Sequence, residues 1–425
     1  MQRFVGRVSW PWLLAGIVLG ILAMWLWSLL PSRDADEEAL GVFRDAYELT
    51  RERFVDEDEA EPTELVYDAI RGMVEGLGDT GHSRFLTPEQ RKRQEQSLAG
   101  TIVGIGVQMT ERDGQPVVVA AFPGSPAAGA GIRSGDRILR VNGDDVSNLT
   151  LAELGERLRG PEGSQLRLTV LHPDATTADL NLRREEVRIP AVTWAPIEGT
   201  SLWHIYISSF SDGTAEELDK ALTAATEAGA TGIILDLRDN PGGLLNEAVG
   251  VASRFLPDGT VLIERDRGGK ETPIEVKDHE PVNTLPLVVL VNNGSASSSE
   301  VVTAALMAQD RATVVGTPTF GTGTVLRTFG LPDGSAVVLG VQEWLTPDGE
   351  PLRNRGITPT EDVPLPEGVE PLVPEQQDAP AQDVCDSRDD QLIAAASDLG
   401  LSCTLGADLG PPPAPAARAP SRTIA

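Results

Sequence analysis

The stretch LPLVVLVNNGSASSSEVVTAALMAQD, residues 285–310, decides the fold. It starts with a continuous apolar run, which is typical of a strand buried on both faces, and it ends with a helix-forming segment. The polar turn GSASSSE, residues 294–300, joins the two. A serine in such a turn lies beside the positive end of the helix dipole, where its oxygen can be exposed. The stretch therefore predicts an α/β sheet that carries a candidate oxygen nucleophile.

Strand and helix signals alternate on the N-terminal side of this stretch. SLWHIYISSF (residues 201–210) and TGIILDLRDN (231–240) are typical of strands, and TAEELDKALTAATEAG (214–229) is typical of an amphipathic helix. This order predicts β-α-β packing around a parallel sheet. We expect residues 189–370 to form this mixed α/β core.

A glycine-rich segment precedes the core and has a different character. Residues 100–188 contain short alternating apolar runs separated by turns, which indicates a small β-rich module. GIGV (residues 104–107) and GSPAAGAGIRSGDRILRVNG (124–143) resemble the motifs of a PDZ domain. The free amides of such a loop can hold a terminal carboxylate, so Gly104, Ile105, Gly106 and Val107 are candidate ligands for peptide tails that end in a free apolar residue.

Four further motifs follow one another in the core: LDLRDNPGG (residues 235–243), NNGSASSSE (292–300), VGTPTFGTGTV (315–325) and EWLTPDGEPLRNRGITPT (343–360). Together they resemble the catalytic core of the carboxyl-terminal processing, or tail-specific, serine proteases. The resemblance covers roughly residues 37–400. It implies a ClpP/crotonase-like β-β-α core, with Ser297 as the nucleophile and the backbone amides of Gly243 and Ser298 as oxyanion donors.

Ser297 also has a purely structural interpretation. The spacing Ser297-x-x-Glu300 fits a capping box, which would simply start the following helix. Capping does not account for the glycine-rich turn at Gly242 and Gly243. Both interpretations of Ser297 stay open at this point.

The chain departs from the family at the general base. The family pattern has a lysine and a glutamine where this sequence has Thr322 and Leu326. A threonine hydroxyl is far too weak a base near neutral pH to replace a desolvated lysine. No lysine follows Lys277, so a shift of register does not supply one.

His82, in the segment DTGHS, is the candidate alternative base. Some relatives use a histidine from a similar place, oriented by a glutamate near the final motif. The matching position here is Arg353, which leaves Glu343 or Glu350 as conjectural orienting residues. An ordinary turn histidine is the other interpretation. The functional alternatives are therefore an active endopeptidase, a pseudoprotease that binds tails without cleaving them, and a PDZ scaffold.

The N-terminal segment predicts a membrane anchor. Residues 8–32 carry no charge, and the run WPWLLAGIVLGILAMWLWSLL is long enough to cross a hydrocarbon layer of ~30 Å. Arg3 and Arg7 precede the run, so a short cytoplasmic N-terminus and an extracytoplasmic bulk are expected. A cleaved signal peptide is the alternative, although no clear cleavage site follows the apolar run.

Helical patterns continue from residue 34 to residue 99, and Thr87, Pro88 and Gln90 predict the capped start of one helix. The apolar stripes of this helical leader need a partner and allow a homo-oligomer. Beyond the core we expect an acidic proline-rich linker, the short helix DDQLIAAASDLG and a disordered proline-rich tail. Cys385 and Cys403 bracket that helix; one disulfide and two free thiols are both possible.

Composition excludes other functions. The formal net charge of −29 argues against a nucleic-acid partner, because a polyanion would be repelled. Neither metal-ligand spacing nor a phosphate loop is present in the sequence, so no cofactor and no metal is expected. The predicted α/β multidomain organisation is a stub and membrane helix (1–33), a helical leader (34–99), a PDZ domain (100–188), a protease core (189–370), and a linker, short helix and tail (371–425).

Overall fold

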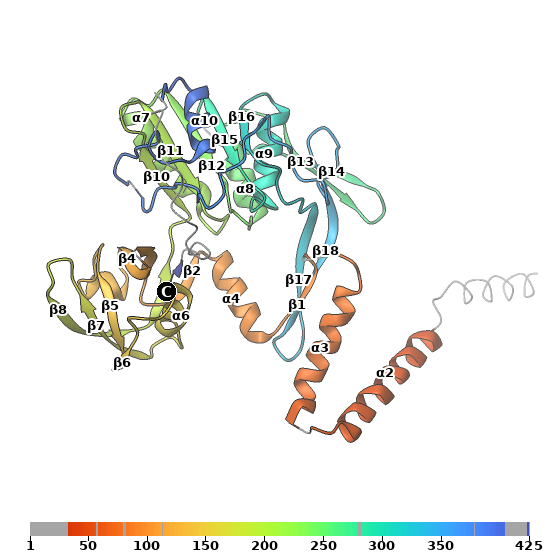
Figure 1. The fold of residues 1–425 in the computed structure, drawn as a ribbon. Coiled ribbons are helices and arrows are strands. Elements are labelled where there is room, and N and C mark those ends of the chain that lie inside the picture. The colour runs from red at the N-terminus through yellow and green to blue at the C-terminus, as the bar shows by residue number, and fades with distance from the viewer. Residues whose placement is uncertain are drawn as a thin grey trace, which may run out of the picture. The chain divides into compact units, whose positions relative to one another are not determined.

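The computed structural model describes residues 33–56, 58–79, 82–112, 114–278, 282–377, 379–403 and 423–424 (Figure 1). The expected membrane span, residues 8–32, lies outside these ranges. No helix within them is both long enough and apolar enough to span a membrane. The chain divides into two units, one that ends at Leu77 and one that starts at Gly78.

The first unit is helical. It contains helix α2 (Arg33–Arg53), a short 3-10 turn (Asp58–Ala60) and helix α3 (Pro62–Glu75). Helix α3 begins with proline at its first position, and the Glu61 carboxylate accepts a hydrogen bond from the Glu64 amide. Several large apolar side chains of α2 are exposed, including Leu40, Val42 and Leu49. The homo-oligomer expected from these stripes stays a prediction.

The second unit begins with strand β1 (Arg84–Leu86) and helix α4 (Pro88–Leu98). The predicted helix start is confirmed. The Thr87 hydroxyl accepts a hydrogen bond from the Gln90 amide, and the Gln90 side chain accepts one from the Thr87 amide. Both halves of the capping box therefore form.

The β-rich module has its own apolar core. That core includes Ile105, Val107, Met109, Leu154 and Leu158, all buried. The elements of the module are β2 (Thr101–Gly104), β3 (Val107–Arg112), β4 (Gln115–Ala121), α5 (Pro126–Gly129), β5 (Arg137–Val141), β6 (Asp144–Asp145), α6 (Leu151–Leu158), β7 (Gln165–Leu171), β8 (Thr177–Arg183) and β9 (Glu185–Arg188). Strands β2 and β9 pair antiparallel at the entry and exit of the module.

A six-stranded sheet forms the centre of the protease-like core, in the order β10-β11-β12-β15-β16-β19. Strand β10 is antiparallel to β11, and every other pair in the sheet is parallel. The strands are β10 (Val192–Pro196), β11 (Leu202–Ile207), β12 (Gly232–Asp236), β15 (Leu287–Val291), β16 (Thr313–Gly316) and β19 (Glu361–Asp362). The predicted parallel α/β sheet is confirmed.

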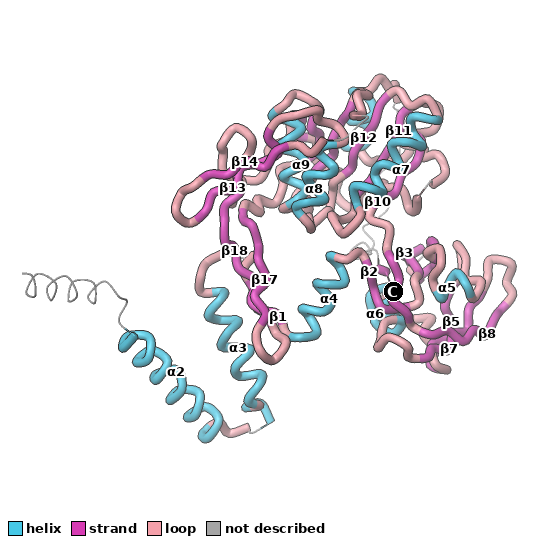
Figure 2. The backbone as a smooth tube through the Cα atoms, turned by 180° about the vertical axis from the view of Figure 1, so that it is seen from behind, coloured by secondary structure: helices cyan, strands magenta, loops and turns pink. Residues whose placement is uncertain are grey.

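Both faces of this sheet are covered, which explains why its strands are continuously apolar. On β15, Val289 and Val291 pack with α7 (Thr214–Glu227), α8 (Leu245–Ser253) and α9 (Ser298–Ala308). Val288 and Leu290 belong to a second apolar cluster with α10 (Asp390–Asp398). Figure 2 shows α7, α8 and α9 along one side of the strands. Successive residues of β15 therefore pack into two different apolar clusters, one on each face of the sheet.

A second sheet brings the start of this unit next to the end of the core. Strand β18 (Ala336–Leu345) pairs with β17 (Thr324–Gly330), with β13 (Thr260–Asp266) and with β1, and β14 (Glu271–Glu275) pairs with β13. In the β1–β18 register, Arg84 lies opposite Val338. Figure 1 labels β1 beside β17 and β18. This pairing fixes the segment that carries His82 beside the loop that leads into β17.

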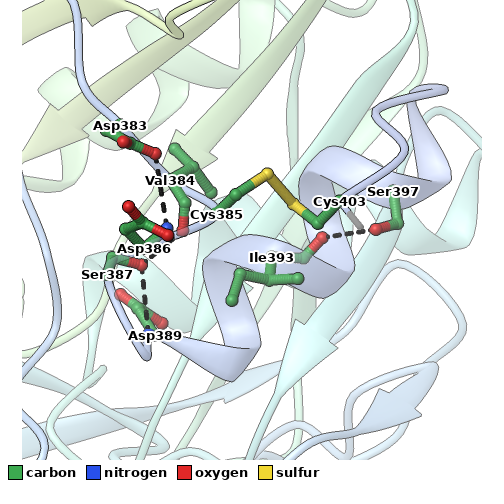
Figure 3. Close-up of a disulfide and its surroundings, with 9 residues drawn as sticks. All are labelled: Asp383, Val384, Cys385, Asp386, Ser387, Asp389, Ile393, Ser397 and Cys403. Carbon is green, nitrogen blue, oxygen red and sulfur yellow. Dashed lines mark hydrogen bonds between the residues drawn. A yellow bond between two sulfur atoms is a disulfide. The ribbon is translucent and has the colours of Figure 1, made fainter. Parts of the chain in front are cut away.

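Residues 371–403 pack on the core, so the prediction of a linker misses their structure. The amide of Gln382 donates to the carbonyl of Pro196, and Val373 and Val384 are buried. Cys385 and Cys403 form a disulfide, with 5.5 Å between their Cα atoms, and it ties the chain after α10 to the segment before it (Figure 3). Of the predicted disordered tail, residues 410–425, all but Thr423 and Ile424 lie outside the described ranges. Its last part does not fit the prediction, because Thr423–Ile424 forms strand β20.

Candidate active site

Ser297 occupies a sharp turn between β15 and α9. Its backbone has φ 55° and ψ −117°, a positive φ that non-glycine residues adopt rarely and that often marks a functional site. Gly242 lies directly against this turn. A Cβ atom on Gly242 would come within 2.6 Å of the Ser297 Cβ and 2.9 Å of the Ser298 amide nitrogen. The glycine is therefore required by the close approach of the two turns.

The two expected oxyanion donors belong to these adjoining turns. The Ser298 hydroxyl donates a hydrogen bond of 3.1 Å to the Gly243 carbonyl. Asn240 holds the turns together, because its side chain accepts from the Gly242 amide and its carbonyl accepts from the Ala296 amide. The structure thus brings Gly243 and Ser298 together beside Ser297, and their role as oxyanion donors stays a prediction.

Glu300 connects the Ser297 turn to the loop that carries Thr322. One of its carboxylate oxygens, Oε2, accepts from the amide of Ser297 at 2.9 Å and from the amide of Thr322 at 2.8 Å. The other, Oε1, accepts from the Gly321 amide and the Thr319 hydroxyl. Burial raises the pKa of Glu300, although these four hydrogen bonds favour its ionised form. The capping residue predicted from sequence is therefore also the link between two parts of the site.

Thr322, at the position of the family lysine, is buried against His82. Its hydroxyl oxygen lies 3.3 Å from His82 Nε2, and the His82 ring packs edge-on against Phe320 with ring centroids 5.7 Å apart. The exposed fractions of His82 and Thr322 are only 8% and 5%. Sequence reasoning left His82 either in a turn or in the site; the structure puts it in contact with the residue that replaces the lysine.

Asp79 is the carboxylate beside His82, and sequence reasoning missed it. Its Oδ1 lies 3.6 Å from His82 Nδ1 and 3.0 Å from Arg353 Nη2. The conjectured orienting residues lie elsewhere: Glu343 pairs with Arg265, and Glu350 pairs with Arg355. Arg353, which stands at the family's glutamate position, instead binds the aspartate that has taken over next to the histidine. The spacing Asp79-x-x-His82 was the available signal.

The charge state of Asp79 follows from its neighbours. Burial by itself would raise the pKa of Asp79, but a hydrogen bond from the Ser83 hydroxyl and the charges of Arg353 and His82 hold that pKa below its usual value. Asp79 is consequently ionised at neutral pH. A negative charge facing Nδ1 favours the tautomer in which Nδ1 carries the proton and Nε2 is free to accept one.

Leu326 lies in β17, opposite Gly340 of β18, and is partly buried. An apolar side chain at the family's glutamine position has no hydrogen-bonding group with which to position a base. That Thr322 and Leu326 replace the family's lysine and glutamine stays a prediction from the sequence motif.

The candidate carboxylate-binding loop of the β-rich module, residues 104–107, accepts hydrogen bonds from residues outside the loop. The Ile105 carbonyl accepts from the Ala127 amide, and the Gly106 carbonyl accepts from the Phe122 amide. Gly106 has φ +77°, and a Cβ there would approach Ser125 Cβ to 2.4 Å. The loop between Gly104 and Val107 therefore has a fixed shape at the start of β3.

Metal-ligating residues do not gather in the described part of the chain. Within residues 33–403, apart from the undescribed positions, no group of three or more His, Cys, Asp or Glu side chains could hold a metal ion.

Family sequence models match both modules. Residues 202–363 match the model described as peptidase family S41, and residues 117–171 match that of the PDZ domain. The class defined by this fold and these matches is a serine-type peptidase core with an inserted PDZ domain. The chain is a homologue of the CtpA carboxy-terminal processing proteases and carries the S41 and PDZ domains of that family.

Two curated relatives illustrate the likeness. The carboxy-terminal processing protease CtpA of Bacillus subtilis is 36% identical over 305 residues, which cover 71% of this chain and 65% of that protein. A probable CtpA-like serine protease of Staphylococcus aureus is 34% identical over 333 residues, 78% of this chain and 66% of that protein. The chain thus spans about two thirds of the length of these relatives. A crystal structure of a putative S41 protease from Bacteroides fragilis, 17% identical, matches with a TM-score of 0.53, covers 83% of this chain and 96% of that one, and supports the fold alone.

Replacing Asp79 by asparagine is expected to lower kcat/KM for peptide hydrolysis about tenfold. The amide keeps the shape of the side chain but removes the negative charge that faces His82 Nδ1. Steady-state peptide hydrolysis measures the change. Arg353→Gln is the matched control, because it leaves the carboxylate in place. An unchanged kcat/KM in Asp79→Asn would show that Asp79 does not act through the histidine.

Proposed function

We propose that this chain is a membrane-anchored, extracytoplasmic serine endopeptidase that captures C-terminal tails with its PDZ domain and cleaves with Ser297. One observation supports the proposed catalytic role of Ser297 and His82. The two nitrogens of His82 have different neighbours: Nδ1 faces the ionised Asp79, and Nε2 faces Thr322, whose amide shares an oxygen of Glu300 with the amide of Ser297. These contacts support His82 as a base that Asp79 orients near Ser297.

The proposed reaction has two steps, acylation of Ser297 and hydrolysis of the acyl ester. The Ser297 oxygen attacks the scissile carbonyl carbon while His82 Nε2 receives its proton, and the negative charge on the carbonyl oxygen is stabilised by the amides of Gly243 and Ser298. The C–N bond breaks as His82 returns the proton to the departing amine, which leaves an acyl ester on Ser297. Water, deprotonated by His82, attacks that ester, and the proton goes back to the Ser297 oxygen.

The substrate class is proposed from the PDZ loop and from the relatives. The Bacillus subtilis relative is described as a carboxy-terminal processing protease, which supports protein tails as substrates. The amides of Gly104 to Val107 suit a terminal carboxylate. The overall charge of −29 favours substrates that are not strongly acidic.

The location is proposed from the sequence and from the disulfide. An uncharged run of residues 8–32 preceded by Arg3 and Arg7 supports a single anchor with the bulk of the chain outside the cytoplasm. The Cys385–Cys403 bond supports the same location, since disulfides persist in oxidising compartments.

Labelling with a serine-reactive phosphonate tests the proposal. The full chain is expected to take up one label, and mass spectrometry is expected to find it on Ser297. Ser297→Ala is expected to remain unlabelled, whereas Ser299→Ala, which removes a buried serine of the same turn, is expected to retain the label. A wild-type chain that binds tail peptides but takes up no label would contradict the peptidase and favour a pseudoprotease, as the loss of the lysine at Thr322 would then suggest.

A further inference from the structure

The last described residues of the chain lie in the PDZ module. Strand β20 (Thr423–Ile424) pairs antiparallel with β3, so that Thr423 lies opposite Met109 and Ile424 opposite Gln108. The three-stranded sheet has the order β20-β3-β4, which makes β3 an open edge wherever β20 is absent. Figures 1 and 2 both mark the C-terminal end among the elements of this module.

Strand β20 also contacts helix α6, so it occupies the groove between that helix and β3. An extended segment added to a free sheet edge, with a helix along its other side, is a bound peptide in the mode of β-augmentation. Its direction is decisive. From Met109 to Gln108 the register advances toward Val107, so the tail runs with its C-terminal end toward the glycine-rich loop of residues 104–107.

We propose that the segment containing strand β20 (Thr423–Ile424) is an intramolecular ligand of the chain's own PDZ groove and competes there with substrate tails. Strand β20 already runs along the β3 edge toward this loop, as an extended peptide ligand would. The inference rests on the proposed capture of tails and adds that the resting groove is occupied. A substrate must therefore displace the tail before it is held.

The length of the connection allows this. The disulfide holds Cys403 to the core segment at Cys385, and nineteen residues, 404–422, separate Cys403 from Thr423. A chain of that length reaches roughly 60 Å when extended at ~3.3 Å per residue. A tethered ligand of this kind is present at an effective concentration in the millimolar range. If the tethered segment and the free peptide both bind the open groove with a Kd of ~0.1 mM, the tethered segment raises the apparent Kd of the free peptide about tenfold.

Peptide binding to truncated chains tests the proposal. All chains carry Ser297→Ala, so nothing is cleaved and the result does not depend on hydrolysis. A fluorescent peptide of residues 418–425, RAPSRTIA, is titrated with the full chain and with a chain that lacks residues 421–425. We expect the truncated chain to bind about tenfold more tightly by fluorescence anisotropy. A chain that instead lacks five linker residues, 411–415, is the matched control and is expected to bind as weakly as the full chain.

The outcomes separate the two proposals. Equal affinity of the full and truncated chains would overturn self-occupancy while leaving tail capture intact. If the truncated chain, folded by circular dichroism, binds the free peptide no better than its C-terminally amidated form, carboxylate capture fails and self-occupancy fails with it. An affinity difference that appears only as protein concentration rises would assign the groove to a second copy and overturn the intramolecular ligand.

Discussion

Replacing His82 by alanine is expected to lower kcat/KM for an unstructured tail substrate by ~10²–10⁴-fold, the usual contribution of general-base assistance. The loss should approach that of Ser297→Ala, because members of one catalytic unit are not additive. The reason lies in the contacts of His82: it is buried, it faces an ionised carboxylate, and it touches the residue that stands where the family has its base. Steady-state hydrolysis by the single and double variants measures both expectations.

The control introduces the lysine and the glutamine of the family pattern. Thr322→Lys with Leu326→Gln would place an amine in the space that now faces His82. In the presence of His82 this cation is expected to reduce activity, since it repels the imidazolium that forms during attack. In the His82→Ala background the same pair is expected to recover part of the rate. Higher activity of the Thr322→Lys pair in the presence of His82 would contradict the histidine mechanism.

Replacing Arg238 by methionine is expected to lower the free energy of unfolding by ~3–5 kcal/mol, the cost of leaving buried charges without their partner. Arg238 is fully buried and bonds both Asp236 and Asp389, with 2.6 Å from Nη2 to Asp236 Oδ2 and 2.8 Å from Nη1 to Asp389 Oδ2. It thereby joins β12 to the start of α10. Urea unfolding followed by circular dichroism gives the difference. Arg355→Met, which breaks an exposed pair with Glu350, is expected to change it by less than ~0.5 kcal/mol.

Low pH is expected to weaken the ion pairs of Arg238 with Asp236 and Asp389. Burial by itself would raise the pKa of Asp236, but the charge of Arg238 and hydrogen bonds from His204 and Arg238 hold it at about 2. An unfolded aspartate titrates near ~3.9, so the folded state binds this proton less readily than the unfolded state. The stabilisation is therefore complete above about pH 4 and is lost as the pH falls toward 2. Unfolding of the wild type should become markedly easier over that interval, whereas Arg238→Met should lose this part of its pH dependence.

Local patterns in the sequence were sufficient for much of the fold. The apolar run before GSASSSE predicted β15 and its turn into α9, and the capping box at Thr87 formed as expected. These features depend on neighbouring residues only. The motif around Phe320 also predicts that Thr322 stands in place of a lysine.

The contact between Arg353 and Asp79 required information that a single sequence does not contain. Arg353 and Asp79 are separated by 274 residues and meet only because β1 pairs with β18. A tail rich in proline was expected to be disordered because composition reports local preference, whereas β20 forms by pairing with a distant edge. The spacing of Glu300 from Ser297 predicted its capping role. Nothing in the sequence predicted that its carboxylate also accepts a hydrogen bond from the Thr322 amide.

The shared carboxylate of Glu300 has a mechanical consequence. The Ser297 amide and the amides of Gly321 and Thr322 are fastened to one buried group, so the nucleophile and the loop facing His82 move as a single rigid piece. Pulling the loop away leaves a buried acceptor unpaired at a cost of ~1–3 kcal/mol for each lost bond. Small displacements are therefore resisted, and a large one separates the Ser297 turn from the Thr322 loop. A force on residues 319–322 is therefore expected to reach Ser297 through the carboxylate of Glu300.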